Sequence, residues 1–331
     1  MGRLGVAFSH GLNASDTVEC AKLAESLGYD SVWMAEGHGG DQFAILAAIA
    51  TQTSKVRIGT CISSVFVRSA PTIAMAAATV DQLSDGRFIL GLGSSHKVQV
   101  EPEHGLPYGK PITRVRETVE IVRRLLRDNQ VQYQGRTVSI ENYELWFEPL
   151  RSKLPIYLSG VFPKMLGVCG AIADGVILTR TTLEACGEMR KHVSVGAEAA
   201  GRDLSQIEIT SLIPAAMSSD RRVALDALRP GVAMYTGFFP RYNRMSAAHG
   251  FADESAAIAD AWSRGDREGA AKLVSDPLID SHCIVGTTQQ CLDKIESYWN
   301  AGIDLPLIAP AAFGADPKAE VLALIKACAP S

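Results

Sequence analysis

The stretch EGHGGD, residues 36–41, places a carboxylate, Glu36, two residues away from an imidazole, His38. It directly follows a short apolar run, residues 31–35, which has the pattern of a buried strand. Carboxylates and imidazoles are common proton-transfer groups in enzymes, and the glycines allow the backbone to approach a flat or bulky ligand closely. Glu36 and His38 are therefore candidates for proton transfer. The alternative is a flexible loop whose acid faces solvent.

Eight apolar runs of this kind alternate with helical patterns along the 331 residues. The predicted strands are residues 4–9, 31–35, 56–61, 88–93, 155–159, 175–179, 207–213 and 305–309. Most are continuous apolar runs, as expected for parallel strands that are buried on both faces. Eight strand–helix units predict the α/β class and a (β/α)8 TIM barrel, for which about 250 residues are typical.

The remaining length is assigned to two insertions. Residues 129–150 are predicted to form a hairpin, and residues 235–276 are predicted to form extra helices. We find no linker and no internal repeat, so residues 1–331 are interpreted as one domain. An open doubly wound sheet is the rival architecture, but GLGSSH does not complete G-x-G-x-x-G because His96 takes the last position.

In a TIM barrel, the residues that follow the strands meet at one end and form the site. Here they are mostly serine and glycine, with few histidines and one acid. They lack the carboxylate cluster of a magnesium site, a convincing set of zinc ligands and a Gly-x-Ser-x-Gly nucleophile motif. We therefore expect no metal and a glycine-lined cup that suits a planar cofactor bearing a phosphate.

Composition excludes several classes of partner. The net charge is −4 and basic residues form no blocks, so we expect neither nucleic acid nor a membrane surface as partner. No apolar run has the length of a membrane span, and the N-terminus lacks the apolar segment of a signal peptide. The seven cysteines form no Cys-x-x-Cys pair, which is typical of reduced thiols in a cytoplasmic protein.

Four stretches carry a resemblance to a known family. They are AESLGYDSVWMAEGHGGDQFAILAAIATQTSKVRIGT, DQLSDGRFILGLGSS, GLPYGKPITRVRETVEIVRRLL and LPIYLSGVFPKMLGVCGAIADGVIL, with a weaker fifth in IVGTTQQCLDKIESYWNAGIDLPLIAP. They resemble luciferase-like flavin and deazaflavin oxidoreductases, and more narrowly the branch that uses coenzyme F420 and includes methylenetetrahydromethanopterin reductase. The family has the same barrel fold, and the inserted helical region shows no clear match.

The resemblance implies roles for particular residues. Glu36 matches the acid beside the reactive deazaflavin carbon, and His38 is shifted by one position from the family's Asp-His pair. Cys61 and Ile62 match a cis peptide bond that supports the ring. Further cofactor contacts are implied for Ser63, Ser64, Gly93, Ser94 and Ser95, and the phosphate loop is implied at Ser159, Gly160 and Val161.

The phosphate assignment also has a physical basis, because backbone N–H groups at a helix N-terminus attract anions. Arg68 and Arg114 are interpreted mainly as structural ion-pair residues.

Together these observations predict an F420-dependent oxidoreductase that transfers a hydride between the deazaflavin and a small organic substrate. One alternative is a luciferase-like monooxygenase that uses FMN. A second, from another class, is a non-catalytic barrel that binds a ligand. We further expect a small-molecule substrate, a homodimer and a cytoplasmic location.

Overall fold

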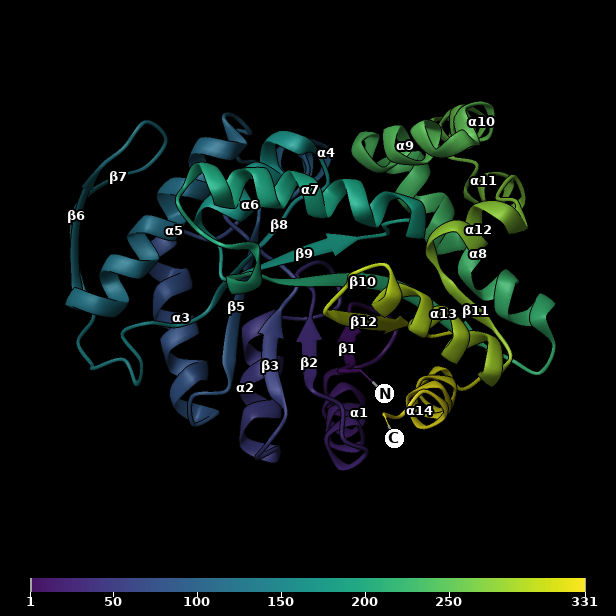
Figure 1. Cartoon of the computed structure of the whole chain (residues 1–331), viewed down its shortest axis with the longest axis horizontal. Helices are drawn as coiled ribbons and strands as arrows, with labels where there is room; N and C mark the ends of the chain where they lie inside the picture. Colours follow the sequence, from purple (N-terminus) through teal and green to yellow (C-terminus); the bar gives the residue numbers. More distant parts are fainter. Residues whose placement is uncertain (1, 331) are drawn as a thin grey trace.

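The computed structural model describes residues 2–330 and contains a closed barrel of parallel strands surrounded by helices (Figure 1). Within these residues the barrel strands are β1 (Gly5–Phe8), β2 (Ser31–Met34), β3 (Arg57–Thr60), β5 (Phe88–Gly93), β8 (Ile156–Ser159), β9 (Gly175–Thr179), β10 (Glu208–Met217) and β12 (Leu305–Pro310). Each pairs with its neighbour in this order, and β12 pairs with β1 to close the ring. The predicted (β/α)8 barrel is confirmed.

Two short strands at the C-terminal end of the barrel were not predicted. β4 (Ser63–Ser64) pairs with the end of β5, and β11 (Ile284–Gly286) pairs with residues 215–217 of β10. β10 therefore continues past the predicted end at residue 213, because a partner distant in sequence extends the pairing. The antiparallel hairpin of β6 (Gln130–Gln134) and β7 (Ser139–Glu144) forms a separate sheet at one side of the molecule (Figure 1).

Helices cover the outer face of the barrel. They are α1 (Ala14–Ser26), α2 (Gln42–Gln52), α3 (Ala70–Leu83), α5 (Pro111–Asp128), α6 (Pro163–Ile172), α7 (Leu183–Ala199), α13 (Thr288–Asn300) and α14 (Pro317–Ala327). Side-chain caps begin several of them, and Asp41 caps α2 by accepting a hydrogen bond from the N–H of Ala44 at 2.9 Å. The loop that contains Glu36 and His38 therefore ends at a capped helix.

A second group of helices lies between β10 and β11, on the side of the molecule away from the hairpin (Figure 1). It comprises α8 (Arg221–Phe238), α9 (Pro240–Ser246), a π-turn (Ala247–Phe251), α10 (Ala252–Ser263), α11 (Arg267–Lys272) and α12 (Asp276–His282). Leu228, Val232, Ile258 and Leu278 belong to a hydrophobic cluster that this group forms largely among its own residues. We call residues 221–282 the helical insert.

The interpretation of the chain as one domain stays a prediction.

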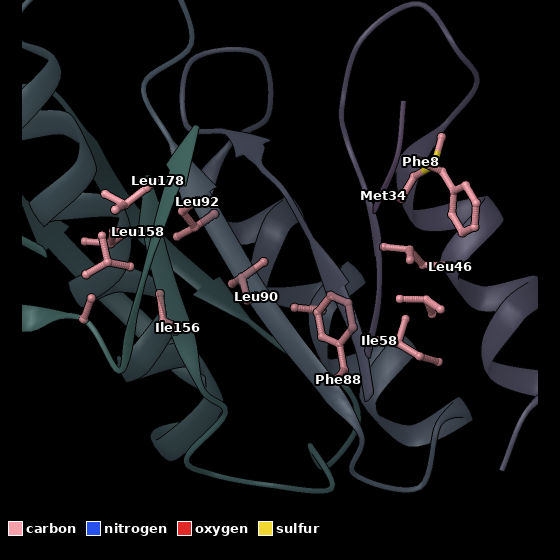
Figure 2. Packing of buried hydrophobic residues seen from close by; sticks show 14 of the residues in the cluster. Phe8, Met34, Leu46, Ile58, Phe88, Leu90, Leu92, Ile156, Leu158 and Leu178 are labelled. Atoms are coloured by element: carbon pink, nitrogen blue, oxygen red, sulfur yellow. The ribbon is translucent and has the colours of Figure 1, made fainter. Parts of the chain in front are cut away.

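Both faces of the barrel strands are buried. Figure 2 shows Met34, Ile58, Phe88 and Leu90 from the strands in the layer between barrel and helices, with Leu46 of α2. Alternate strand residues point into the barrel, where the rings of Trp33 and Tyr157 have centroids 5.7 Å apart. This double burial explains why the strands have continuous apolar sequences.

A charged network lies at the N-terminal ends of the strands. Asp30 accepts hydrogen bonds from Arg3 Nε at 2.7 Å and Arg57 Nε at 2.9 Å, and Glu208 accepts one from Tyr157 Oη at 2.6 Å. The charges and hydrogen-bonding groups of this network are paired with one another. In TIM barrels the N-terminal end of the strands typically contributes to stability, and this pairing is consistent with that role. The opposite end, which we call the mouth, contains the candidate site residues.

No helix in residues 2–330 has the length and apolar character needed to cross a bilayer.

Candidate functional site

Glu36 follows β2 at the mouth, and its side chain is 15% exposed. Its Oε2 accepts hydrogen bonds from the N–H of Ser64 at 2.7 Å and from Ser63 Oγ at 3.3 Å. Its Oε1 accepts a hydrogen bond from Arg68 Nε. The carboxylate is therefore fixed in one orientation by donors that all come from the segment after β3.

Arg68 bridges Glu36 and Asp41. Its Nη2 lies 2.6 Å from Asp41 Oδ2, and its guanidinium carbon lies 5.1 Å from the ring centroid of Phe43. Burial alone would raise the pKa of Asp41, but the hydrogen bonds from Arg68 and Ala44 lower it overall. The ion-pair interpretation of Arg68 is confirmed, and one of its partners is the candidate catalytic acid itself.

For Arg114 the interpretation as an ion-pair residue is wrong. It forms no ion pair in the described part of the chain; its Nε donates to the carbonyl of Val65 at 2.7 Å, and its guanidinium carbon lies 4.9 Å from the ring centroid of Phe66. Burial lowers its pKa, and the nearby Glu117 opposes that effect only partly. Arg114 supports the segment after β3 through a carbonyl and an aromatic ring, which local sequence does not reveal.

His38 points to a different partner from Glu36. Its side chain is 76% exposed, and its Nε2 lies 3.3 Å from Oε2 of Glu103 in α4 (Lys97–His104). This contact joins the loop after β2 to the helix after β5. The two proton-transfer candidates, which lie two residues apart in sequence, therefore have separate environments. Glu36 is mostly buried and held by donors, whereas His38 faces solvent.

The peptide bond between Cys61 and Ile62 is cis, as the family resemblance implied. Burial raises the pKa of the Cys61 thiol, so the thiol stays protonated and unreactive at neutral pH. Ser63 and Ser64 are buried. Ser63 Oγ and the N–H of Ser64 both donate to Glu36, while Ser64 Oγ accepts a hydrogen bond from the N–H of Phe66 at 3.3 Å. Both serines thus position the acid and the following turn.

Four apolar residues pack on the interior of the barrel without being fully buried, and we call them the apolar floor. Ala35, Ile62, Leu212 and Ala309 are partly buried and pack on the interior cluster of the barrel that contains Trp33. They come from the ends or outer parts of four different strands. A partly exposed apolar floor ringed by polar groups is the kind of surface on which a flat aromatic ring binds.

Gly93 ends β5, and its implied cofactor contact stays a prediction. A Cβ at Gly93 would lie 2.7 Å from Cδ1 of Ile62, so the missing side chain makes room for Ile62. Arg241 of α9 binds the next two residues, donating to Ser94 Oγ at 3.1 Å and to the carbonyl of Ser95 at 2.9 Å. It also donates to Tyr108 Oη at 2.5 Å. The helical insert therefore contacts this loop directly.

His96 packs among aromatic residues of the insert. Its ring centroid lies 4.4 Å from that of Phe239 and 5.4 Å from that of Tyr242. Burial, reinforced by the charge of Arg241, lowers the pKa of His96 from 6.5 to about 3. His96 is therefore neutral at physiological pH and anchors the insert by packing.

Ser159, Gly160 and Val161 connect β8 to α6. A Cβ at Gly160 would lie 3.1 Å from Met165 Cγ and 3.3 Å from Leu166 N, so this loop packs closely on the first turn of α6. No side chain caps the helix at Phe162. An N-terminus without a side-chain cap has backbone N–H groups that can bind an anion. With the apolar floor, this loop fits a planar cofactor that bears a phosphate.

The sequence model of the luciferase-like monooxygenase family matches residues 2–305. The chain belongs to this family. Its relatives are named as reductases and F420-dependent oxidoreductases, and the family membership identifies the chain as an oxidoreductase. It is similar to 5,10-methylenetetrahydromethanopterin reductase from Archaeoglobus fulgidus, with 27% identity over 96% of this chain and 96% of the relative.

Two solved structures share the luciferase-like fold along nearly the whole chain. A coenzyme F420-dependent tetrahydromethanopterin reductase from Methanopyrus kandleri superposes with a TM-score of 0.88 at 24% identity and covers 99% of this chain and 98% of its own. An F420-dependent secondary alcohol dehydrogenase in complex with an F420–acetone adduct superposes with a TM-score of 0.80 at 23% identity, covering 99% of each chain. Because both identities are below 25%, these two similarities establish the fold of this chain and nothing about its activity.

Proposed function

We propose that this chain is an F420-dependent oxidoreductase that transfers a hydride between the deazaflavin and a small organic substrate. The observation that supports this most is the similarity, over almost the full length, to a methylenetetrahydromethanopterin reductase. The apolar floor and the loop at the start of α6 fit such a cofactor. A deazaflavin supplies a ring carbon that accepts or donates a hydride.

In this proposal, Ile62 and the apolar residues beside it support the ring, and the loop of Ser159, Gly160 and Val161 holds the phosphate. Glu36 handles the substrate proton, because it is the acid at the mouth that is both shielded and fixed in position. When an alcohol is oxidised, its hydroxyl proton passes to the Glu36 carboxylate as the carbon loses hydride; reduction of a carbonyl returns the proton. His38 is the alternative proton-transfer group.

An FMN-dependent monooxygenase is the second candidate, because the family model describes luciferase-like monooxygenases. A flavin has a reactive ring nitrogen where the deazaflavin has carbon, so only the flavin sustains oxygen chemistry when reduced. A non-catalytic ligand-binding barrel is the third, and the shielded and anchored Glu36 argues against it. The homodimer and the cytoplasmic location stay predictions.

Titration with each cofactor separates these functions. We expect the purified protein to quench F420 fluorescence on binding and to bind FMN more weakly. Tight binding of FMN alone, with oxygen consumption when the flavin is reduced, would replace our proposal with a monooxygenase. Failure to bind either cofactor would support the non-catalytic barrel.

A further inference from the structure

Arg180 immediately follows β9 at the mouth, and nothing in residues 2–330 pairs with its charge. Its Nε and Nη1 are buried without a hydrogen-bond partner. The guanidinium carbon lies 3.7 Å from the ring centroid of Tyr235 in α8, so the group is held against an aromatic face. Arg180 as a whole is only partly buried, but two of its guanidinium nitrogens are shielded from water and unpaired. Buried donors without a partner are costly, and such groups in a native protein call for a ligand or another explanation.

The backbone also holds Arg180 in an unusual conformation. Its φ is +53°, in the left-handed region that residues other than glycine rarely adopt. Such conformations persist where the surrounding structure enforces them and are frequent at ligand sites. The position of Arg180 is therefore set by the fold.

Arg180 borders a cleft between the end of β9 and the helical insert, which we call the Arg180 cleft. Its lining contains many groups that can donate hydrogen bonds: Arg180, Thr182, Tyr242, His249, Ser281 and His282. No aspartate or glutamate is among the lining residues in the described chain. A cleft with a fixed cation, several donors and no carboxylate matches an oxyanion such as a carboxylate or phosphate.

His282 does not offset the positive charge in this cleft. Ser281 Oγ lies 3.0 Å from His282 Nδ1. Burial, with smaller contributions from the charges of Arg180 and Lys294, lowers the pKa of His282 from 6.5 to about 3. The imidazole is therefore neutral near pH 7, and the guanidinium is the charge that a ligand would meet.

The cleft is adjacent to the candidate cofactor site but distinct from it. Tyr242 lines the cleft and also packs against His96, which follows Ser94 and Ser95. The phosphate loop, residues 159–161, is not part of the cleft lining. Tyr242 therefore lies between the cleft and the loop after β5.

We propose that the Arg180 cleft is an oxyanion site that binds a carboxylate or phosphate group of the substrate. The assignment to the substrate rests on the proposed function; the binding of an oxyanion does not. The helical insert then has a role, because it supplies Tyr235, Tyr242 and His282 to this site. The substrate class becomes a small organic anion.

Phosphate binding, followed through thermal unfolding without any cofactor, tests the site. We expect millimolar inorganic phosphate to stabilise the wild-type protein. Arg180→Gln should weaken the apparent affinity about tenfold or more, and Arg180→Lys should retain part of it because the charge remains. Arg222→Gln is the matched control, since Arg222 is an exposed arginine of α8 and lies outside the cleft. It should bind phosphate as the wild type does.

A second variant separates the cleft from the phosphate loop. Gly160→Val disturbs the loop before α6 and should leave the Arg180-dependent stabilisation unchanged. If Arg180→Gln binds phosphate as well as the wild type, if Gly160→Val abolishes the stabilisation instead, or if the wild type shows no stabilisation, the proposed site is wrong.

Cofactor titration then identifies the source of the anion. Unchanged F420 affinity in Arg180→Gln assigns the oxyanion to the substrate. Weakened F420 affinity would place the cofactor phosphate at Arg180 and overturn the substrate assignment. Absence of F420 binding to the wild-type protein would contradict the proposed function while leaving the phosphate result intact, so the two failures are distinguishable.

Discussion

At the scale of single residues, the sequence indicates chemical type better than it indicates contacts. Glu36 was identified from its position after an apolar run, and the structure places it at the mouth with donors on both carboxylate oxygens. Its neighbour His38 instead contacts Glu103 in α4. The difference arises because residues 63–68, distant in sequence, provide every donor to Glu36.

Glu36→Gln tests the proton-transfer role. Glutamine preserves the shape and the acceptor for the N–H of Ser64, but it removes the charge and the proton-accepting group. We expect the variant to fold and bind cofactor, with turnover lower by about 10²–10⁴-fold, the usual range for general acid–base catalysis. Single-turnover rates measured by the absorbance of F420 would show this.

His38→Asn is the control for that experiment. It removes an exposed imidazole and its contact with Glu103, so we expect turnover near that of the wild type. The reverse pattern, with Glu36→Gln active and His38→Asn impaired, would assign the proton to His38. Full activity of both variants would leave the loop a purely structural role.

At the scale of secondary-structure elements, burial decided which parts were predictable. The barrel strands were found because both of their faces are buried, which leaves a continuous apolar run in the sequence. β4 and β11 are two and three residues long, and they exist because β5 and β10 pair with them. The aromatic packing of His96 on α9 could not be predicted, since no local pattern links residues that far apart.

The contact of Arg241 with the loop after β5 should determine how firmly the helical insert covers the mouth. We predict that Arg241→Gln accelerates hydrogen exchange in residues 94–108 about tenfold, because hydrogen bonds from a charged group to Ser94 and Ser95 are lost. Mass spectrometry of exchanged peptides would measure this. Arg244→Gln, on the same helix but stacked over Phe162, should leave these peptides unchanged. Equal protection in Arg241→Gln and the wild type would show that the loop is ordered without the insert.

At the scale of the whole molecule, the two ends of the barrel differ in how their charges are satisfied. At the N-terminal ends, Arg3 and Arg57 are paired with Asp30 and Glu208. At the mouth, Arg180 and Arg241 form no ion pair in the described residues, and the histidines beside them are buried and neutral. The paired charges at the N-terminal end contribute to stability. The arginines at the mouth are available to ligands, and the neutral histidines beside them make the folded protein less stable at acid pH.

That arrangement predicts a pH dependence of stability. The pKa values of His96 and His282 are about 3 in the folded protein, against 6.5 for an ordinary histidine. The unfolded chain therefore binds protons between about pH 6.5 and pH 3 that the folded protein does not, so stability is fully present above pH 6.5 and falls as the pH decreases through this window. Between pH 7.5 and pH 5.5 we expect a loss of about 1 kcal/mol in unfolding free energy for each of the two histidines.

Urea unfolding at these two pH values, in buffers without phosphate or carboxylate, would measure this loss. His282→Gln should reduce the pH-dependent difference by about half, whatever its effect on absolute stability, because one of the two responsible groups is gone. The control is His104→Gln, which removes an exposed imidazole at the end of α4 and should preserve the wild-type difference. If His282→Gln keeps the full difference, folding does not lower the pKa of His282, and its imidazole gains a proton as the pH falls from 7.5 to 5.5. The Arg180 cleft would then hold two cations, and it would bind its oxyanion more tightly as the pH falls.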